Sequence, residues 1–432
     1  MDNKRMILEM LREGKITTEE AQQLLEAIDK KDESEGPKNS TKFGAKSGER
    51  FDFTFDTDEI KEKFSDMGKK LENATNINSE DIKVFGQNLG ETLLGLGKEL
   101  ESAFSDMVGG FKDYSTTLRK NNESITSNHS LDISDVENPQ IDFKAINGGI
   151  SLKENTEDDL VKIKVKASYK SQEIETGDSL YDFYLEGSSL VFSPKYTNVN
   201  IDIEAMLPGK EFGLVTLATK NGRVSVENLN IDSLGVETQN GSIRLVETNI
   251  NQANLKTQNA AIEVKYTNIE ELIANTNNGR ILLDAISAQN LDLKTSNGKF
   301  YLTGVKAETT VLKTSNASVN VDAIETEKLL VKTSNGRIEL SNYNQETMKE
   351  IDLTTSNASI NVDRLPEEKA VSLDLETSMG NIQVNKDKLI YIKNQHANYG
   401  MKRVLAESID YENAESKLQI KATSSNGSIK IG

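Results

Sequence analysis

The sequence predicts a mainly β protein: a single-stranded parallel β-helix, or solenoid, with coils of about 19 residues, preceded by an α-helical N-terminal region. Three observations predict this fold. A phrase of the form Thr-x-Asn-Gly recurs at a nearly fixed interval over the second half of the 432 residues. Apolar and polar residues alternate on both sides of it, with the period of two that a half-buried strand has. Residues 51–124 instead carry apolar side chains at helical spacing.

The repeat is most regular between residues 216 and 341, where each Thr is followed two positions later by an Asn and the next Thr comes 19 residues on. Further copies follow at Thr355 and Thr377, each 22 residues after the last, and the final copy contains Asn426. An outlying copy lies at Asn147. Because Asn tolerates the left-handed backbone conformation and Gly adopts it freely, we expect a sharp corner there. The predicted turn and ladder residues are Thr238, Asn240, Thr257, Asn259, Thr276, Asn278, Thr295, Asn297, Thr314, Asn316, Thr333 and Asn335.

An array of β-hairpins would satisfy the same local pattern, since Asn-Gly between alternating apolar residues is also a hairpin signal. The constant period favours the solenoid. In a solenoid one repeat is one coil, so equal repeat length places equivalent residues above one another at about 4.8 Å. Thr over Thr and Asn over Asn would then form ladders along the stack.

Less regular sequence flanks the repeat. Residues 125–215 contain longer, irregular strand patterns and are expected to form an entry or cap. The solenoid itself is assigned to 216–432, with an insertion near 385–417. Open ends of such a stack need caps, because an unpaired strand edge is a template for aggregation.

Residues 1–30 predict a short helical hairpin. Gly14 can end its first helix, and Thr17 with Glu20 forms a capping box at the start of the second. Two helices this short need a docking partner, either the rest of the chain or a second copy. The candidate docking face is Ile7, Leu11, Leu24, Leu25 and Ile28. Residues 31–50 have almost no apolar side chains and predict a flexible linker.

Residues 51–124 predict amphipathic helices, one of them long, with a stripe of large apolar residues softened by several glycines. Three docking surfaces are open for this stripe: the solenoid, a second copy, or a membrane or amphipathic peptide. The candidate ligand, membrane or partner-binding face is Ile82, Phe85, Leu89, Leu93, Leu96, Leu100, Phe104, Met107 and Phe111.

The composition of the chain disfavours several kinds of partner and several kinds of site. The net charge of −18 disfavours nucleic acid and unaided electrostatic docking on anionic lipid. There is no Cys and only His129 and His396, and no spacing suggests a nucleophile with its base or a metal site, so we expect no enzyme activity and no cofactor. The acids Glu157, Asp158 and Asp159 are expected to be solvated loop charges. Without a signal peptide or an apolar span in these residues, we expect a cytoplasmic protein that can associate with the membrane, or reach the surface by non-classical export.

Two motifs together resemble a known group of bacterial proteins. The opening RMILEMLREGKITTEEAQQLLEAI resembles the short helical-hairpin module that begins many proteins of Gram-positive bacteria, and the T-x-N-G-x-I-x-L coils resemble the bacterial β-helix domain called "putative adhesin". The pairing is similar to the envelope-stress proteins that include the daptomycin-sensing surface protein of enterococci and its Bacillus relatives. This resemblance implies a non-enzymatic role in the response to cell-wall-active antibiotics and antimicrobial peptides, with a membrane-bound signalling system as partner.

Two functional hypotheses follow. In the first, the chain is a sensor or regulatory scaffold of envelope stress that acts through protein contacts and through amphipathic peptides or the membrane surface, with self-association possible through its N-terminal helices. In the second, it is an adhesin-like structural module that binds cell-wall glycan through the faces of the coils. A polysaccharide-active enzyme would need a cluster of Asp and Arg that breaks the repeat, and the sequence has none at any spacing we recognise.

Overall fold

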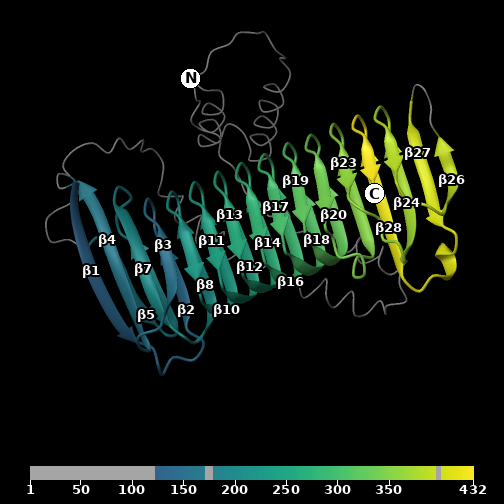
Figure 1. The fold of residues 1–432 in the computed structure, drawn as a ribbon. Coiled ribbons are helices and arrows are strands. Elements are labelled where there is room, and N and C mark those ends of the chain that lie inside the picture. The colour runs from purple at the N-terminus through teal and green to yellow at the C-terminus, as the bar shows by residue number, and fades with distance from the viewer. Residues whose placement is uncertain (1–121, 171–178, 396–399) are drawn as a thin grey trace, which may run out of the picture. The chain divides into compact units, whose positions relative to one another are not determined.

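The computed structural model describes residues 122–170, 179–395 and 400–432. These residues all belong to one unit of the chain. The predicted hairpin and linker lie outside the described residues, as do residues 51–121 of the predicted helical region, so these remain predictions; the last three residues of that region, 122–124, begin a strand. The described part is mainly β, with no α-helix, and its strands form two long sheets (Figure 1).

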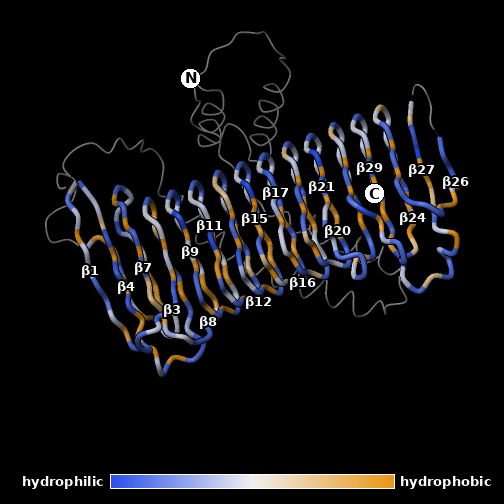
Figure 2. The backbone as a smooth tube through the Cα atoms, in the orientation of Figure 1, coloured by the Kyte–Doolittle hydropathy of each residue, from blue (hydrophilic) through white to orange (hydrophobic). Residues whose placement is uncertain are grey.

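Each regular coil contributes one long and one short strand. In the coil around Thr295, β16 (Ser287–Thr295) runs to the Thr corner and β17 (Phe300–Thr303) follows it in the opposite sheet. Leu291 and Leu293 of β16 point inward, as do Phe300 and Leu302 of β17, and all four are buried. The alternation of apolar and polar residues is visible along the strands in Figure 2. The core is therefore a continuous apolar layer between two sheets.

Both sheets are built mainly from parallel neighbours. The 14-stranded sheet, here sheet A, contains β1 (Asn122–Asp132), β4 (Leu160–Lys170), β7 (Asn200–Pro208), β3 (Ile150–Asn155), β9 (Val224–Glu227), β11 (Ile243–Val246), β13 (Ile262–Lys265), β15 (Ile281–Asp284), β17, β19 (Val319–Asp322), β21 (Ile338–Ser341), β23 (Ile360–Val362), β29 (Ile429–Ile431) and β25 (Ile382–Val384), in this spatial order.

The 15-stranded sheet, sheet B, contains β26 (Leu389–Gln395), β27 (Lys402–Ser408), β24 (Ala370–Thr377), β28 (Lys417–Ser424), β22 (Glu350–Thr355), β20 (Glu325–Lys332), β18 (Lys306–Lys313), β16, β14 (Asn268–Thr276), β12 (Asn249–Thr257), β10 (Asn230–Thr238), β8 (Glu211–Thr219), β2 (Gln140–Lys144), β6 (Ser189–Pro194) and β5 (Tyr181–Glu186), again in spatial order. One short 3-10 helix, Tyr411–Asn413, precedes β28.

The register in the middle of the stack is the predicted one. From β10 to β16 in sheet B, Thr238, Thr257, Thr276 and Thr295 lie opposite one another in successive parallel strands. The solenoid is therefore confirmed over the hairpin array, because hairpins would pair adjacent units antiparallel.

The order of coils is not sequential at either end, and this corrects the expected stacking. The coil around Asn147, formed by β2 and β3, lies between β6–β7 and β8–β9, both of which follow it in sequence. The last copy of the repeat, β28–β29, lies between β22–β23 and β24–β25, both of which precede it. Thr377 therefore stacks on Ser424, and does not follow Thr355 directly.

The two outermost coils carry antiparallel strands. At the N-terminal end β4 and β1 extend sheet A beyond β7, and β5 extends sheet B beyond β6. At the C-terminal end β27 and β26 extend sheet B beyond β24, and they fall in the predicted insertion. Sheet A has no described strand beyond β25, so the two sheets end at different levels there.

Candidate binding surface

The buried Thr of each repeat joins neighbouring coils through hydrogen bonds. In the middle of the stack, the Thr295 hydroxyl accepts a hydrogen bond from the Gly298 N–H at 3.0 Å and donates to the Gly279 carbonyl of the coil before it at 3.1 Å. The side chain closes its own corner and fastens it to the next, so a buried polar group has partners on both sides. Related bonds to the preceding coil are made by Thr238, Thr257, Thr276, Thr314 and Thr333.

The Asn two residues later forms a ladder on the surface. Asn297 donates from Nδ2 to Asn278 Oδ1 at 2.8 Å, and its own Oδ1 accepts from Asn316 Nδ2 at 2.7 Å. The same side-chain bond joins Asn147, Asn221, Asn240, Asn259, Asn278, Asn297, Asn316, Asn335, Asn357 and Asn426 in one chain of amides. Each amide is used by its neighbours, so the ladder holds the stack together and offers a ligand little.

The expected left-handed corner is wrong in position. Neither Asn297 nor Gly298 has a positive φ; the left-handed residues lie nine positions after each Thr, at the opposite corner, as in Ala285 (φ 54°) and Gly304 (φ 62°). Gly298 serves a close approach instead. In its present backbone conformation, a Cβ there would lie 1.6 Å from the Gly279 carbonyl oxygen in the coil before it. The glycine therefore lets two backbones approach at this corner, where a side chain would require the corner to shift.

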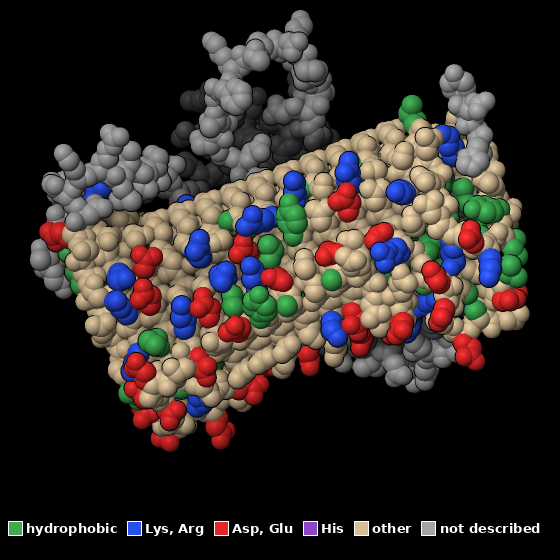
Figure 3. Space-filling view, viewed as in Figure 1, with side chains coloured by type: hydrophobic (Ala, Val, Ile, Leu, Met, Phe, Trp, Pro, Cys, Tyr) green, Lys and Arg blue, Asp and Glu red, His purple; other side chains and the backbone are tan. Residues whose placement is uncertain are grey.

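The outward faces carry interleaved charges. Figure 3 shows Lys and Arg mixed with Asp and Glu over the visible face. In sheet A, Arg280 Nη2 lies 2.9 Å from Glu263 Oε1, and Arg244 Nη1 lies 3.7 Å from the other carboxylate oxygen. The hydrogen bond from Arg280 holds the pKa of Glu263 below its usual value, against the opposing effect of its partial burial. These pairs cross between coils and are those of a solvated sheet face.

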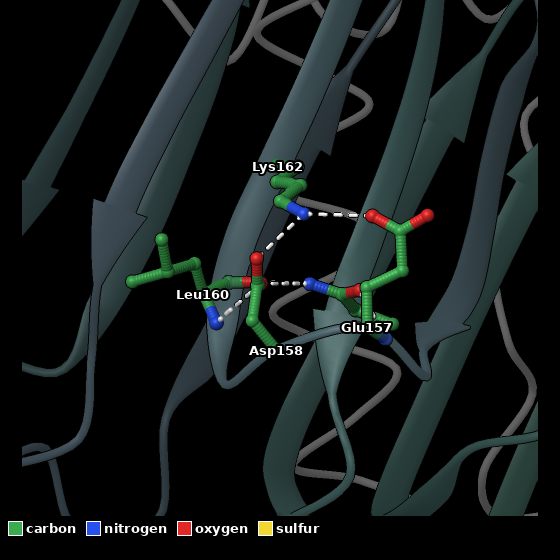
Figure 4. A network of polar contacts seen from close by, with 5 residues as sticks. Glu157, Asp158, Leu160 and Lys162 are labelled. Carbon is green, nitrogen blue, oxygen red and sulfur yellow. Dashed lines mark hydrogen bonds and ion pairs between the residues drawn. The ribbon is translucent and has the colours of Figure 1, made fainter.

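The acids expected to be solvated loop charges form an ordered turn between β3 and β4 (Figure 4). Asp158 lies 2.7 Å from Lys162 Nζ and accepts hydrogen bonds from the Asn155 amide and the Leu160 N–H. Glu157 pairs with the same lysine at 3.1 Å. The Lys162 hydrogen bond leads the interactions that lower the pKa of Asp158. An ionised carboxylate satisfied in this way stabilises a turn and is not poised for acid–base chemistry.

The N-terminal end of the core is closed by aromatic side chains from both sheets. His129 Nε2 on β1 lies 2.7 Å from the Tyr181 hydroxyl on β5, so the pair joins sheet A to sheet B. The Tyr181 ring stacks on Phe192 with centroids 4.7 Å apart, and Phe183 lies 5.2 Å from the His129 ring. This end therefore has a lid of packed rings.

Both ends have edge strands with exposed apolar side chains, and the C-terminal end, which has more of them, is the strongest candidate binding surface. Three successive residues of β26 are exposed: Ile390 by 50%, Tyr391 by 45% and Ile392 by 65%. Among the described residues β26 pairs only with β27, so its other backbone edge is open. Hydrophobic side chains gather at this end of the space-filling view (Figure 3). We call Ile390, Tyr391 and Ile392 the β26 edge. It combines an open strand edge with apolar side chains, the two elements of strand addition.

The β26 edge was not among the residues predicted from sequence. Its signal was present in LIYIKNQ, an apolar run inside the predicted insertion, but whether such a run is buried depends on what packs against it. The predicted partner faces, Ile82 to Phe111 and Ile7 to Ile28, lie outside the described residues and stay predictions.

In 122–170, 179–395 and 400–432 no group of three or more His, Asp or Glu side chains is arranged to hold a metal ion. Over the same ranges, no helix has the length and hydropathy needed to cross a membrane.

Comparison with known proteins gives two partial family matches. Residues 262–432 match the family described as Toastrack DUF4097, and residues 2–33 match a SHOCT-like domain. A solved structure from Clostridium sporogenes ATCC 15579, described as "a putative cell adhesion protein", is 11% identical and aligns with 72% of this chain and 99% of that chain, at a TM-score of 0.21. No curated protein matches the chain. The part of the chain from β13 onward is thus similar to the Toastrack β-solenoid family.

Proposed function

We propose that this chain is a non-enzymatic binding protein of the bacterial cell envelope, in which the solenoid is a scaffold that presents the β26 edge to a protein or peptide. The observation that carries the proposal is the edge itself: the outer edge of β26 has no partner strand among the described residues, and three apolar side chains are exposed there, at the end of a tightly bonded stack. The finer role, sensing or regulation in envelope stress, is supported by the resemblance of the repeat and of the opening hairpin to envelope-stress proteins.

The net charge of the chain indicates which kind of ligand it would bind. With a net charge of −18, the chain attracts cationic partners and repels anionic lipid surfaces. A cationic amphipathic peptide combines the charge that complements the chain with the apolar residues that fit the β26 edge. An extended peptide of this type would add as a strand and place alternate side chains over Ile390 and Ile392.

The test is binding of the full chain to a synthetic Lys/Leu amphipathic peptide, followed by isothermal calorimetry. We expect saturable binding that weakens at least tenfold in the Ile390→Ser/Ile392→Ser variant. Ile125→Ser is the matched control, because Ile125 is similarly exposed but lies on β1 at the other end. Equal affinities of all three proteins, or no binding at all, would refute the proposal. Vesicles of phosphatidylglycerol form a second arm, in which binding would assign the surface to lipid.

A glycan-binding role is the second candidate. Tyr266 and Tyr301 are exposed, by 58% and 37%, on the solenoid surface, and aromatic rings of this kind can stack on sugar rings. Co-sedimentation of the full chain with purified peptidoglycan tests it. Loss of binding in Tyr266→Ala/Tyr301→Ala, but not in Ile390→Ser/Ile392→Ser, would favour this candidate.

A further inference from the structure

Residues 417–431 form a coil that fills a slot between two coils joined directly in sequence. In sheet B, β28 pairs with β22 on one side and with β24 on the other, both in parallel. In sheet A, β29 lies between β23 and β25 in the same way. The chain thus leaves β23, skips one layer, builds β24–β25, and returns with residues 417–431 to the layer it skipped.

The returning coil is held as firmly as a central one. Its inward side chains, Leu418, Ile420, Ala422, Ile429 and Ile431, are completely buried. At the corner, Asn426 donates to Asn357 at 2.6 Å and Ser424 donates to the Ala358 carbonyl at 3.1 Å. On the other side Thr377 donates to the Gly427 carbonyl at 2.9 Å. All these contacts join the coil to the walls of the slot, and they would be the same if the coil came from another molecule.

The walls of the slot are also tied to each other without the coil. The connection 363–369, which spans the skipped layer, is fixed to the segment before β22: Lys369 Nζ donates to the carbonyls of Gln345, Glu346 and Met348, at 3.1, 2.8 and 2.6 Å. The Tyr343 hydroxyl donates to the Arg364 carbonyl at 2.7 Å. On the far side, Lys386 Nζ, beyond β25, donates to the Pro366 carbonyl. The slot therefore has a bridge that keeps its two walls connected.

The linker that delivers the coil packs loosely. Residues 409–416 connect β27 to β28, and the 3-10 helix within them buries no residue and has no side-chain cap. Ile409 is 61% exposed. The linker contacts the coil through the hydrogen bond from Lys417 Nζ to the Glu412 carbonyl and through the position of that ammonium over the Tyr411 ring. Rearranging the linker would therefore disturb little packing.

We propose that the slot between β22–β23 and β24–β25 is an exchange site that takes residues 417–431 of a second copy of this chain. Two copies that each donate the coil and each receive it form a closed, two-fold dimer. Because the contacts in the slot are the same within one molecule and between two, the choice depends on the linker and on protein concentration.

Linker length gives the test. β27 and β28 lie on opposite sides of β24, so the linker crosses about two strand spacings, roughly 9.6 Å, and must also pass around the end of β24. Deleting 410–415 leaves two residues between Ser408 and Lys417, which reach about 11 Å only when fully straight. The shortened full-length chain should therefore exchange its coil between molecules.

We expect light scattering to give twice the 47.8 kDa of one chain, with residues 417–431 protected from hydrogen exchange. Adding Ile420→Asp to the shortened chain should abolish the dimer, whereas Lys430→Asp should not, because Ile420 is buried while Lys430 faces outward between Asn361 and Gln383. A monomer of the shortened chain, with its coil either seated or released, would overturn the proposal.

A peptide experiment tests the slot by itself. In the full-length Ile420→Asp/Ile429→Asp variant the chain's own coil cannot be buried, and hydrogen exchange at residues 230–340 checks that the central coils remain folded. A fluorescent synthetic peptide of residues 417–431 should bind this variant one to one and should not bind the unaltered chain. A folded variant with a released coil that fails to bind the peptide would show that the slot collapses when empty, which contradicts the proposal.

Discussion

The middle of the solenoid and its ends use the same coil but order it differently. From β8 to β21 each coil stacks on the one before it in sequence, and the Asn ladder joins residues 19 apart. At the N-terminal end the ladder joins residues 74 apart, and at the C-terminal end 69 apart. The difference teaches that the repeat determines how a coil is built and what it can stack on, while the connections determine which coil is its neighbour.

The two ends also differ from each other. The N-terminal end is closed by rings from both sheets, with His129 and Tyr181 in contact. At the C-terminal end sheet B continues through β27 and β26 where sheet A has stopped, and apolar side chains are exposed. A bulge between Tyr391 and Lys393 makes this edge irregular, which protects against uncontrolled pairing while leaving it open to a specific partner.

The largest expected effect on the free energy of unfolding comes from a substitution in the middle of the solenoid. Phe300 is fully buried in β17, and its neighbour Tyr301 points outward. We expect Phe300→Ala to lower the free energy of unfolding by about 3–5 kcal/mol. Tyr301→Ala should cost about 0.5 kcal/mol or less. Urea unfolding of both variants measures the contrast, and similar losses would mean that the inward and outward faces of this coil are wrongly assigned.

A large-to-small substitution in the core at the C-terminal end should also create a cavity, but its effect should be local. Ile429→Ala removes a fully buried side chain from the inserted coil and should cost about 2–5 kcal/mol, as should Ile281→Ala in the middle. In a stack, however, each coil contacts only its neighbours. Hydrogen exchange should therefore rise at 417–431 in Ile429→Ala while 230–340 stay protected, whereas Ile281→Ala should expose central coils. A uniform loss of protection in both variants would contradict the local effect expected of a stack.

Substitution of Gly298, at the corner that follows Thr295, should lower the free energy of unfolding by less. Gly298→Ala places a Cβ against the Gly279 carbonyl and should cost about 1–3 kcal/mol. Alanine occurs at the equivalent positions 260, 317 and 358, each time between glycines in the adjacent coils. The double variant Gly298→Ala/Ala317→Gly restores that alternation, so thermal unfolding should show part of the stability recovered. Full additivity of the two changes would mean that the corners do not interact.

Much of the fold could be predicted because each repeat contains the pattern that determines it. A Thr and an Asn at constant spacing, with alternating apolar residues, require the stack that the structure has. The order at the ends could not be predicted, because the steps from Thr333 to Thr355 and from Thr355 to Thr377 are equally long. The first carries three extra residues in a loop between adjacent coils, and the second spans a skipped layer.

The corner and the candidate surface show two other limits of the sequence. Asn-Gly suggested a left-handed turn because both residues permit one, but the same glycine also permits close approach of two backbones, and the sequence does not distinguish these uses. The β26 edge is apolar like a core strand, and its exposure depends on sheet A ending at β25. Both are tertiary facts that no local pattern contains.

The Asn ladder should contribute modestly. Asn297→Ala removes one bond to Asn278 and one from Asn316, both on the surface. Since exposed amides exchange these bonds for bonds to water, we expect a cost of about 1 kcal/mol in the free energy of unfolding. Asn320→Ala, on the outward face of β19, is the control and should be close to neutral. Equal effects in urea unfolding would deny the ladder a stabilising role.

The smallest expected effect is electrostatic and concerns the interleaved charges of the central coils. The Arg280 hydrogen bond holds the pKa of Glu263 below its usual 4.5. A carboxyl whose pKa is lower when folded contributes stability above its unfolded pKa, and that stability is lost as the pH falls through the folded pKa. The pair is partly exposed, so we expect about 0.5 kcal/mol, measured as the difference in unfolding free energy between pH 7 and pH 3 for the wild type and Arg280→Met. That difference should be smaller in Arg280→Met, and it should shrink at high salt because exposed pairs are screened. An identical pH dependence in the two proteins would show that the stack is held by its core and its ladders alone.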